Sequence, residues 1–155
     1  MSQVALREVI ESDFPILFEH RRDREAAQMA AFGTLDPDAS QFVQRLKQSM
    51  SEGATVRTIL FADTVVGLVA SFRHDGEPQV TYWIDRAHWG KGIASAALTQ
   101  LLKLVTTRPL YASAAGDNLG SLRVLEKCGF RVSRSARAFA NARGSEVEEM
   151  FFELR

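Results

Sequence analysis

The sequence predicts a single α/β domain, spanning residues 1–155, in which helices cover both faces of a mixed β-sheet. A chain of 155 residues suits one sizeable core. Hydrophobic residues make up 46% of the chain and charged residues 25%, which is ordinary for a globular protein. The residue patterns follow the order strand, helices, three strands, helix, strand, helix and two strands, and this order favours the α/β class.

The first fifty residues predict one strand followed by three helices. The strand ends at Glu11-Ser12-Asp13, three residues that break the apolar pattern and can cap a helix. The third helix is amphipathic, with Phe42, Val43 and Leu46 on one side. The expected ranges are 4–10 for the strand and 14–21, 25–32 and 40–50 for the helices, with a turn-rich stretch at 33–39.

The rest of the chain predicts six strands and two helices. Residues 65–72 are nearly all apolar, as expected for a central strand that is buried on both faces. Gly129 can end the second helix in the left-handed conformation. The expected strands are 56–62, 65–74, 79–85, 108–114, 130–138 and 147–154, and the expected helices open at 89–94 and 118 and run to about 106 and 128.

Composition and charge argue against several functional classes. The formal net charge is zero, and no basic stripe or acidic tail stands out, so nucleic acid is not expected as a partner. A single cysteine, Cys128, cannot form an intrachain disulfide. No apolar stretch approaches about 18 residues and no signal-peptide pattern is visible, so we expect a cytoplasmic protein that does not span a membrane. No metal site is predicted.

The stretch Trp89-Gly90-Lys91-Gly92-Ile93-Ala94 joins a predicted strand directly to a predicted helix. Two glycines let the backbone approach a ligand closely, and the free amides of a helix N-terminus can hold a phosphate. The simpler alternative is a turn that binds nothing. A P-loop is rejected because it needs four residues between its glycines, and the dinucleotide fingerprint is rejected because Ser95 stands where it needs glycine or alanine.

Two segments resemble the signatures of the GCN5-related N-acetyltransferases (GNATs). The first signature is Gln/Arg-x-x-Gly-x-Gly/Ala at a strand-to-helix junction, and the chain matches it at Gly92 and Ala94 but has Trp89 at its first position. The second is the run from Asn118 to Phe130, where Asn-x-x-Ser precedes Leu-Glu-Lys-x-Gly-Phe. This run is most similar to the branch that acetylates the N-termini of ribosomal proteins. The order of elements extends the resemblance over the whole chain.

The resemblance implies a GNAT fold, with a mostly antiparallel sheet of about seven strands and a splayed central pair, here residues 79–85 and 108–114. It also implies that acetyl-CoA enters the gap between these two strands. The alternative for Asn118 and Ser121 is a helix N-cap with a serine in the first turn. The implied cofactor contacts are the amides of Trp89, Gly90, Lys91, Gly92, Ile93 and Ala94 with the pyrophosphate, and Asn118 and Ser121 with the pantetheine arm and thioester.

Two catalytic residues of many relatives are missing at the positions that the resemblance implies. Gln79 stands where glutamate is usual, and Leu125 stands where tyrosine is usual. Gln79 cannot accept a proton, so the base has to come from elsewhere. Cys128 is expected to be a packed thiol, because direct attack by an amine needs no acyl-enzyme. The candidates that remain are His74, Glu77 or a water near Tyr82 and Asp85 as the base, and Ser121 as the acid.

We therefore expect an enzyme that moves an acetyl group from acetyl-CoA to a primary amine, on a protein N-terminus or a small molecule, by direct attack in a ternary complex. At pH 7 an α-amine is neutral roughly 14% of the time and a lysine amine about 0.04%, so a missing base favours the α-amine. Substrate recognition is expected from residues 20–24 and 143–146, unless these are only solvated charges. A non-catalytic acyl-CoA-binding module, a nucleotide-binding regulatory domain and a homodimeric assembly are kept open as alternatives.

Overall fold

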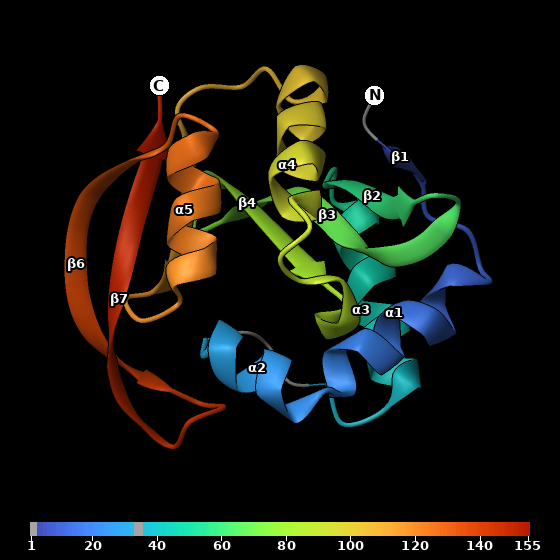
Figure 1. Cartoon of the computed structure of the whole chain (residues 1–155), viewed down its shortest axis with the longest axis horizontal. Coiled ribbons are helices and arrows are strands. Elements are labelled where there is room, and N and C mark those ends of the chain that lie inside the picture. Colours follow the sequence, from blue (N-terminus) through green and yellow to red (C-terminus); the bar gives the residue numbers. More distant parts are fainter. Residues whose placement is uncertain (1–2, 33–35) are drawn as a thin grey trace.

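The computed structural model describes residues 3–32 and 36–155, and these form one seven-stranded sheet with helices on both faces (Figure 1). The strand order is β1-β2-β3-β4-β5-β7-β6, and every neighbouring pair is antiparallel except β4 and β5. The strands are β1 (Val4–Glu8), β2 (Thr55–Phe61), β3 (Thr64–His74), β4 (Glu77–Ile84), β5 (Leu110–Ala115), β6 (Arg131–Ala140) and β7 (Ser145–Leu154). The helices are α1 (Asp13–Arg22), α2 (Arg24–Ala30), α3 (Ala39–Ser51), α4 (Ile93–Leu104) and α5 (Leu119–Lys127), with a short 3₁₀ helix, η1 (Arg86–His88), before α4.

The predicted class and the predicted order of elements are confirmed. The strand expected to be buried on both faces is β3, whose residues from Val66 to Ser71 are all buried. Gly129 follows α5 with a φ angle of 96°, as a helix-ending glycine should. Residues 33–35 of the predicted turn-rich stretch lie outside the described residues.

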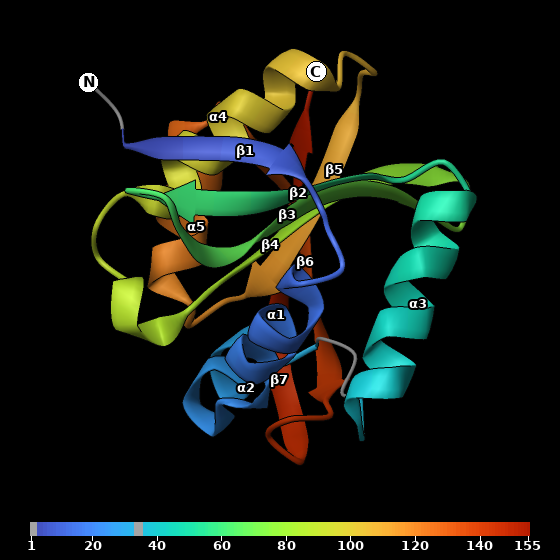
Figure 2. The same ribbon diagram turned by 90° about the vertical axis from the view of Figure 1, so that its right-hand side faces the viewer.

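Each face of the sheet packs against its own group of helices. On one face, Ile93, Leu98 and Leu101 of α4 and Leu125 of α5 pack against β-strand side chains in the larger core cluster. On the other face, α1 and α3 form a second cluster with β2 and β3 (Figure 2). β4 therefore presents Val80, Tyr82 and Ile84 to the α4–α5 side, because alternate residues of a strand point to opposite faces.

The start of α1 differs from the prediction. Ser12 is the N-cap residue but makes no side-chain capping hydrogen bond. Asp13, one of the three residues expected to cap this helix, is 1% exposed and accepts hydrogen bonds from Arg7, Thr58 and the backbone amide of Ile10. Its carboxylate thus ties α1 to β1 and β2, a role that the local pattern did not reveal.

The central strand pair separates almost as soon as it forms. β4 and β5 run parallel, and their ladder contains a single pair of Cα partners, Gln79 and Tyr111, near the start of both strands. Beyond this point the backbone groups of β4 that face β5 have no partner on that strand. The predicted splay is confirmed, with its closed end at Gln79 and its open end where α4 and α5 begin.

Candidate active site

The loop between β4 and α4 has the backbone that the glycine pattern predicted. Gly90 and Gly92 have φ angles of 79° and 75°, which residues with a Cβ rarely adopt. A Cβ added to either glycine would meet no protein atom within 4 Å, so the space beside both is open to a ligand. In the described part of the chain, Ala96 donates the first backbone hydrogen bond of α4, to the Gly92 carbonyl at 3.2 Å. The preceding amides are therefore free, and together with the helix dipole they favour an anion.

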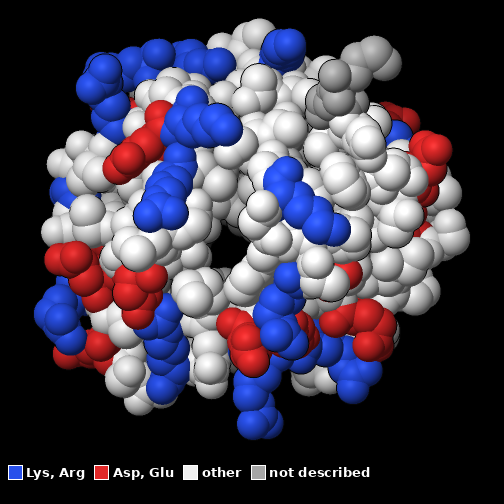
Figure 3. Space-filling view, viewed as in Figure 1, with Lys and Arg blue, Asp and Glu red and all other residues white. Residues whose placement is uncertain are grey.

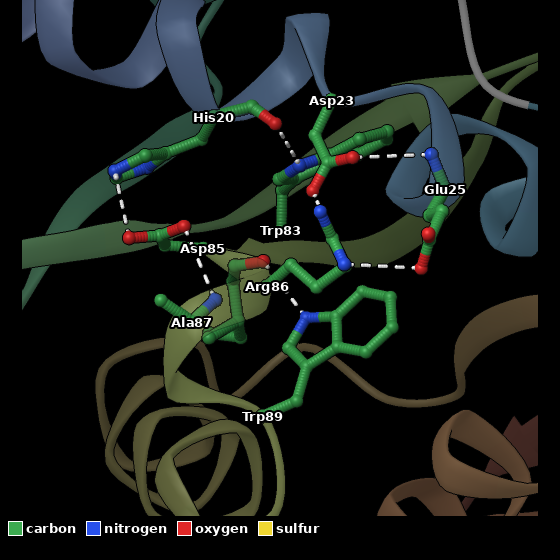
Figure 4. Close-up of polar contacts among 9 residues, drawn as sticks. His20, Asp23, Glu25, Trp83, Asp85, Arg86, Ala87 and Trp89 are labelled. Atoms are coloured by element: carbon green, nitrogen blue, oxygen red, sulfur yellow. Dashed lines mark hydrogen bonds and ion pairs between the residues drawn. The ribbon is translucent and has the colours of Figure 1, made fainter.

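Trp89 stands at the start of this loop and is turned back onto β4. Its indole Nε1 donates to the Ile84 carbonyl at 3.0 Å (Figure 4). Its backbone amide donates to the Arg86 carbonyl at 3.2 Å. Both N–H groups of Trp89 are thus occupied, and its predicted amide contact with a pyrophosphate is not supported by this geometry. The residue instead fixes the entry of the loop against the end of the strand.

Arg86 connects the same loop to the first two helices. Its Nε and Nη1 atoms donate to the carboxylates of Asp23 and Glu25, and Asp23 also caps α2 by accepting from the Glu25 amide (Figure 4). The Arg86 guanidinium lowers the pKa of the Asp23 carboxyl through their hydrogen bond. The sequence-based prediction assigned residues 20–24 to substrate recognition or to solvated charge, but Asp23 binds Arg86 in the segment that precedes α4. The contact with Arg86 was not predicted, because 63 residues separate Arg86 from Asp23.

His20 is the other residue of this region that faces the loop. Its Nε2 atom is 3.8 Å from the Asp85 carboxylate, and its backbone carbonyl accepts from the Trp83 indole (Figure 4). Burial lowers the pKa of His20, Asp85 partly opposes this effect, and His88 adds to it. His20 is therefore neutral at pH 7, and its buried Nδ1 has no hydrogen-bond partner in the described structure.

Asn118 has the structural role that was weighed against cofactor binding. Its Oδ1 atom accepts from the Ser121 amide at 3.3 Å and caps α5, while its Nδ2 atom donates to the Met29 carbonyl of α2 at 3.3 Å. Both ends of the side chain are thus engaged, and a cofactor contact by Asn118 stays a prediction. Next to it, Asp117 forms a bidentate pair with Arg143, which anchors the β6–β7 hairpin and accounts for one of the predicted recognition residues.

Ser121 contacts Tyr82, which the sequence analysis named only as a neighbour of a candidate catalytic water. The Tyr82 hydroxyl on β4 donates to Ser121 Oγ at 2.7 Å, across the gap between the splayed strand and α5. Burial raises the pKa of Tyr82 to about 12, although the hydrogen bond to Ser121 acts in the opposite direction. A period-two count from Val80 places Tyr82 on the α5 side of β4, so the alternation of the strand was the signal that could have identified it.

The other predicted catalytic residues lie at the closed end of the splay. The side chain of Gln79 makes no hydrogen bond within the described residues. Glu77 lies two residues earlier on the same face and borders an open groove of about 310 Å³ that Tyr111 also lines. His74, whose side chain is 71% exposed, lies beside Asp75 at the β3–β4 turn. Tyr82 is five positions beyond Glu77 on β4, roughly 16 Å along the strand, so the fold does not bring His74 or Glu77 to Ser121.

Leu125 and Cys128 belong to the packing of α5. Leu125, which the resemblance aligned with a catalytic tyrosine of many relatives, is 3% exposed and part of the core. Cys128 is half-buried, and its Sγ atom lies 3.7 Å from both the Ser95 carbonyl and the Thr99 hydroxyl of α4. The thiol therefore packs between the two helices.

The space-filling view shows a hollow near the centre of the molecule. In the orientation of Figure 1, background is visible through it between the regions of α5 and of the loop that precedes α4 (Figure 3). Lysine and arginine side chains lie on both sides of this opening. Aspartate and glutamate side chains lie below and to the left of it, so the basic groups are mainly above it and to its right. The opening suits a long ligand that passes through the splay, and the basic side chains beside it favour an anion.

Among the described residues, no helix has the length and apolar character needed to cross a membrane.

Comparisons with known proteins agree with this geometry. A family model described as an acetyltransferase (GNAT) domain matches residues 3–131. An uncharacterised N-acetyltransferase from Bacillus licheniformis is 25% identical over 98% of this chain and 92% of its own length.

Solved structures share the fold at lower identity. A ribosomal-protein-alanine N-acetyltransferase from Brucella melitensis has a TM-score of 0.82 at 20% identity, covering 96% of this chain and 98% of its own. A phosphinothricin acetyltransferase from Sinorhizobium meliloti, solved with acetyl-CoA, has a TM-score of 0.85 at 18% identity, covering 97% and 87%. The family match spans most of the chain and confirms the predicted N-acetyltransferase class, and the chain therefore belongs to the GNAT acetyltransferase family.

Proposed function

We propose that the protein transfers an acetyl group from acetyl-CoA to the primary amine of a protein N-terminus or a small molecule. The observation that carries this proposal is the splay, in which one Cα pair joins β4 to β5 and a glycine loop with free helix amides lies at the open end. This arrangement offers a slot for an extended arm and an anion site at the mouth of the slot. The acetyl-CoA bound in the Sinorhizobium meliloti structure supports the choice of donor.

The residues of the splay have distinct parts in the proposed reaction. The amides from Gly90 to Ala94 bind the pyrophosphate, and the unpaired backbone of β4 beyond Gln79 lies along the arm. A backbone amide on this edge can donate to the oxygen of the thioester carbonyl, where negative charge develops. Gln79 cannot act as a base, but its free amide group can orient the carbonyl or the incoming amine.

The proposed step is direct attack of a neutral amine on the thioester carbon. The nitrogen forms the new C–N bond, and the electron pair of the C–S bond leaves with the sulfur as thiolate. The proton lost by the amine neutralises the thiolate, so that an amide and CoA result. Cys128 takes no part, because its thiol is packed against α4.

An α-amine or a small amine of low pKa is the proposed acceptor class. His74 and Glu77 lie away from Ser121, and Gln79 replaces the usual carboxylate, so the neutral fraction of the amine is expected to limit the rate. That fraction is about two orders of magnitude higher for an α-amine than for lysine at pH 7. The resemblance of residues 118–130 to the N-terminal acetylating branch supports this choice. The ribosomal-protein alanine named for the Brucella melitensis relative is an acceptor of the same class.

The test measures release of CoA thiol from acetyl-CoA against a panel of amines. The panel contains two peptides of one sequence, one with a free N-terminus and a blocked lysine, the other with these reversed. Faster turnover of the free-lysine peptide at pH 7 would contradict the acceptor class.

A second reading is an acyl-CoA-binding module without catalysis, favoured by the buried Leu125 and by Gln79 at the two catalytic positions. Calorimetric binding of CoA without thiol release to any amine would establish that reading. Binding of ATP or NAD in preference to CoA would remove both readings.

A further inference from the structure

The hydrogen bond between Tyr82 and Ser121 is a cross-link over the splay. The two hydroxyl oxygens are 2.7 Å apart, with Tyr82 as the donor. Ser121 Oγ donates to nothing within the described residues, and the backbone amide of Ser121 is held by the Asn118 cap. The hydroxyl hydrogen of Ser121 therefore remains available to an acceptor that is not part of the chain.

The pair lies on the route that a cofactor arm would take. Tyr82 is three residues beyond Gln79, about 10 Å along β4 towards the glycine loop. Ser121 is in the first turn of α5, on the other side of the gap. An arm that starts at the loop amides and reaches towards the closed end of the splay has to pass these two hydroxyl groups.

We propose that Tyr82 is a positioning residue, which orients Ser121 so that the Ser121 hydroxyl donates a hydrogen bond to the CoA sulfur as the C–S bond breaks. This inference rests on the proposed function and assigns two residues to its leaving-group step. The electron pair of the C–S bond goes to sulfur, the hydrogen stays on Ser121 Oγ, and the amine supplies the proton that forms the thiol. No other reactant is needed.

Proton affinities explain why the two residues donate hydrogen bonds but do not transfer protons. Burial raises the pKa of Tyr82 to about 12, whereas a thiol has a pKa of about 8.5, so a proton on Tyr82 would not move to a thiolate. The same high pKa keeps Tyr82 protonated at every working pH, so its hydroxyl keeps the hydrogen that it donates to Ser121. A hydrogen bond to a charged sulfur is stronger than one to a neutral thioester, and Ser121 therefore favours departure of the thiolate.

The test is the ionisation of bound CoA, which needs no acceptor and no turnover. The ultraviolet absorbance of the thiolate is titrated with CoA bound to a Cys128→Ala protein, in which the ligand carries the only thiol. A thiolate that accepts from Ser121 should ionise with a pKa about one unit below that of free CoA, a tenfold change in the ionisation constant.

Two substitutions and their combination then separate positioning from packing. Tyr82→Phe keeps the ring, and Ser121→Ala removes the donor, so each should return the bound thiol towards the pKa of free CoA. The double variant should be no worse than Ser121→Ala, because Tyr82 acts through Ser121. Tyr111→Phe, which alters the other tyrosine of the chain, is the matched control and should leave the thiol unchanged.

Kinetics supply the second readout. Tyr82→Phe should lower kcat about tenfold, the cost of about one oriented hydrogen bond, while KM for acetyl-CoA stays within about twofold. A wild-type pKa of the bound thiol in Tyr82→Phe, or additive losses in the double variant, would overturn the positioning role. An unshifted thiol in an unsubstituted protein that still acetylates amines would overturn this inference and leave the proposed function standing. Failure to bind CoA would remove both.

Discussion

Replacement of Gly92 by valine tests whether the loop before α4 binds the pyrophosphate of CoA. Gly92 has a φ angle of 75°, and a Cβ there meets no protein atom within 4 Å. The substitution therefore costs only backbone strain, about 1–2 kcal/mol of the free energy of unfolding. The new side chain would fill the space beside the free amides of α4, so CoA affinity should fall at least tenfold, which corresponds to about 1.4 kcal/mol.

Gly76 provides the matched comparison. It has a φ angle of 79° at the β3–β4 turn, and a Cβ there also meets no protein atom within 4 Å. Gly76→Val should lose the same stability as Gly92→Val, measured by denaturant unfolding, and keep the wild-type CoA affinity, measured by calorimetry. If valine proves too strained to fold, the alanine pair gives the same comparison. Equal CoA affinity in the two folded variants would refute the assignment of the loop to the pyrophosphate.

Three further outcomes are expected. Burial raises the pKa of Asp13, but the hydrogen bonds from Arg7, Ile10 and Thr58 together outweigh it and lower the pKa from 3.8 to about 2. The carboxylate therefore adds about 2 kcal/mol to the free energy of unfolding above pH 4. This contribution is lost as the pH falls through 2, and about 1 kcal/mol of it is lost by pH 3. In Asp13→Asn the free energy of unfolding, measured by denaturant, should fall less steeply with acid. An unchanged slope of that free energy against pH would contradict the assignment. Cys128→Ala should keep most of the acetyltransferase activity, and an acetyl adduct on Cys128 in intact-mass spectra would disprove direct attack. Arg86→Gln should release the glycine loop from α2 and weaken CoA binding without removing any phosphate contact. A CoA affinity equal to that of the wild type would show that the ion pairs of Arg86 with Asp23 and Glu25 do not contribute to CoA binding.

Local rules of the chain were enough to predict most of the fold and the backbone of the glycine loop before α4. Strand alternation, helix periodicity and turn residues act over a few neighbours, so each element appeared in the sequence close to its observed bounds. The positive φ angles of Gly90 and Gly92 and the cap by Asn118 are of the same kind, since a backbone conformation or a cap depends on residues within one turn. The splay was predicted from the resemblance of two segments to the family's signatures, and not from the residue pattern of either strand.

Contacts between distant segments were decided by the tertiary structure alone. Tyr82 and Ser121 are 39 residues apart, and Thr58 is 45 residues from Asp13, yet each pair is hydrogen-bonded. Such pairs form only when sheet register and helix packing bring two elements together. Strand alternation can give the face on which Tyr82 lies, but it does not name the residue that Tyr82 contacts. The same register places His74 at the far end of β4 from Ser121, although the sequence ranked both as catalytic candidates. Short-range conformational preferences thus determined which elements form, and their packing determined which side chains share a site.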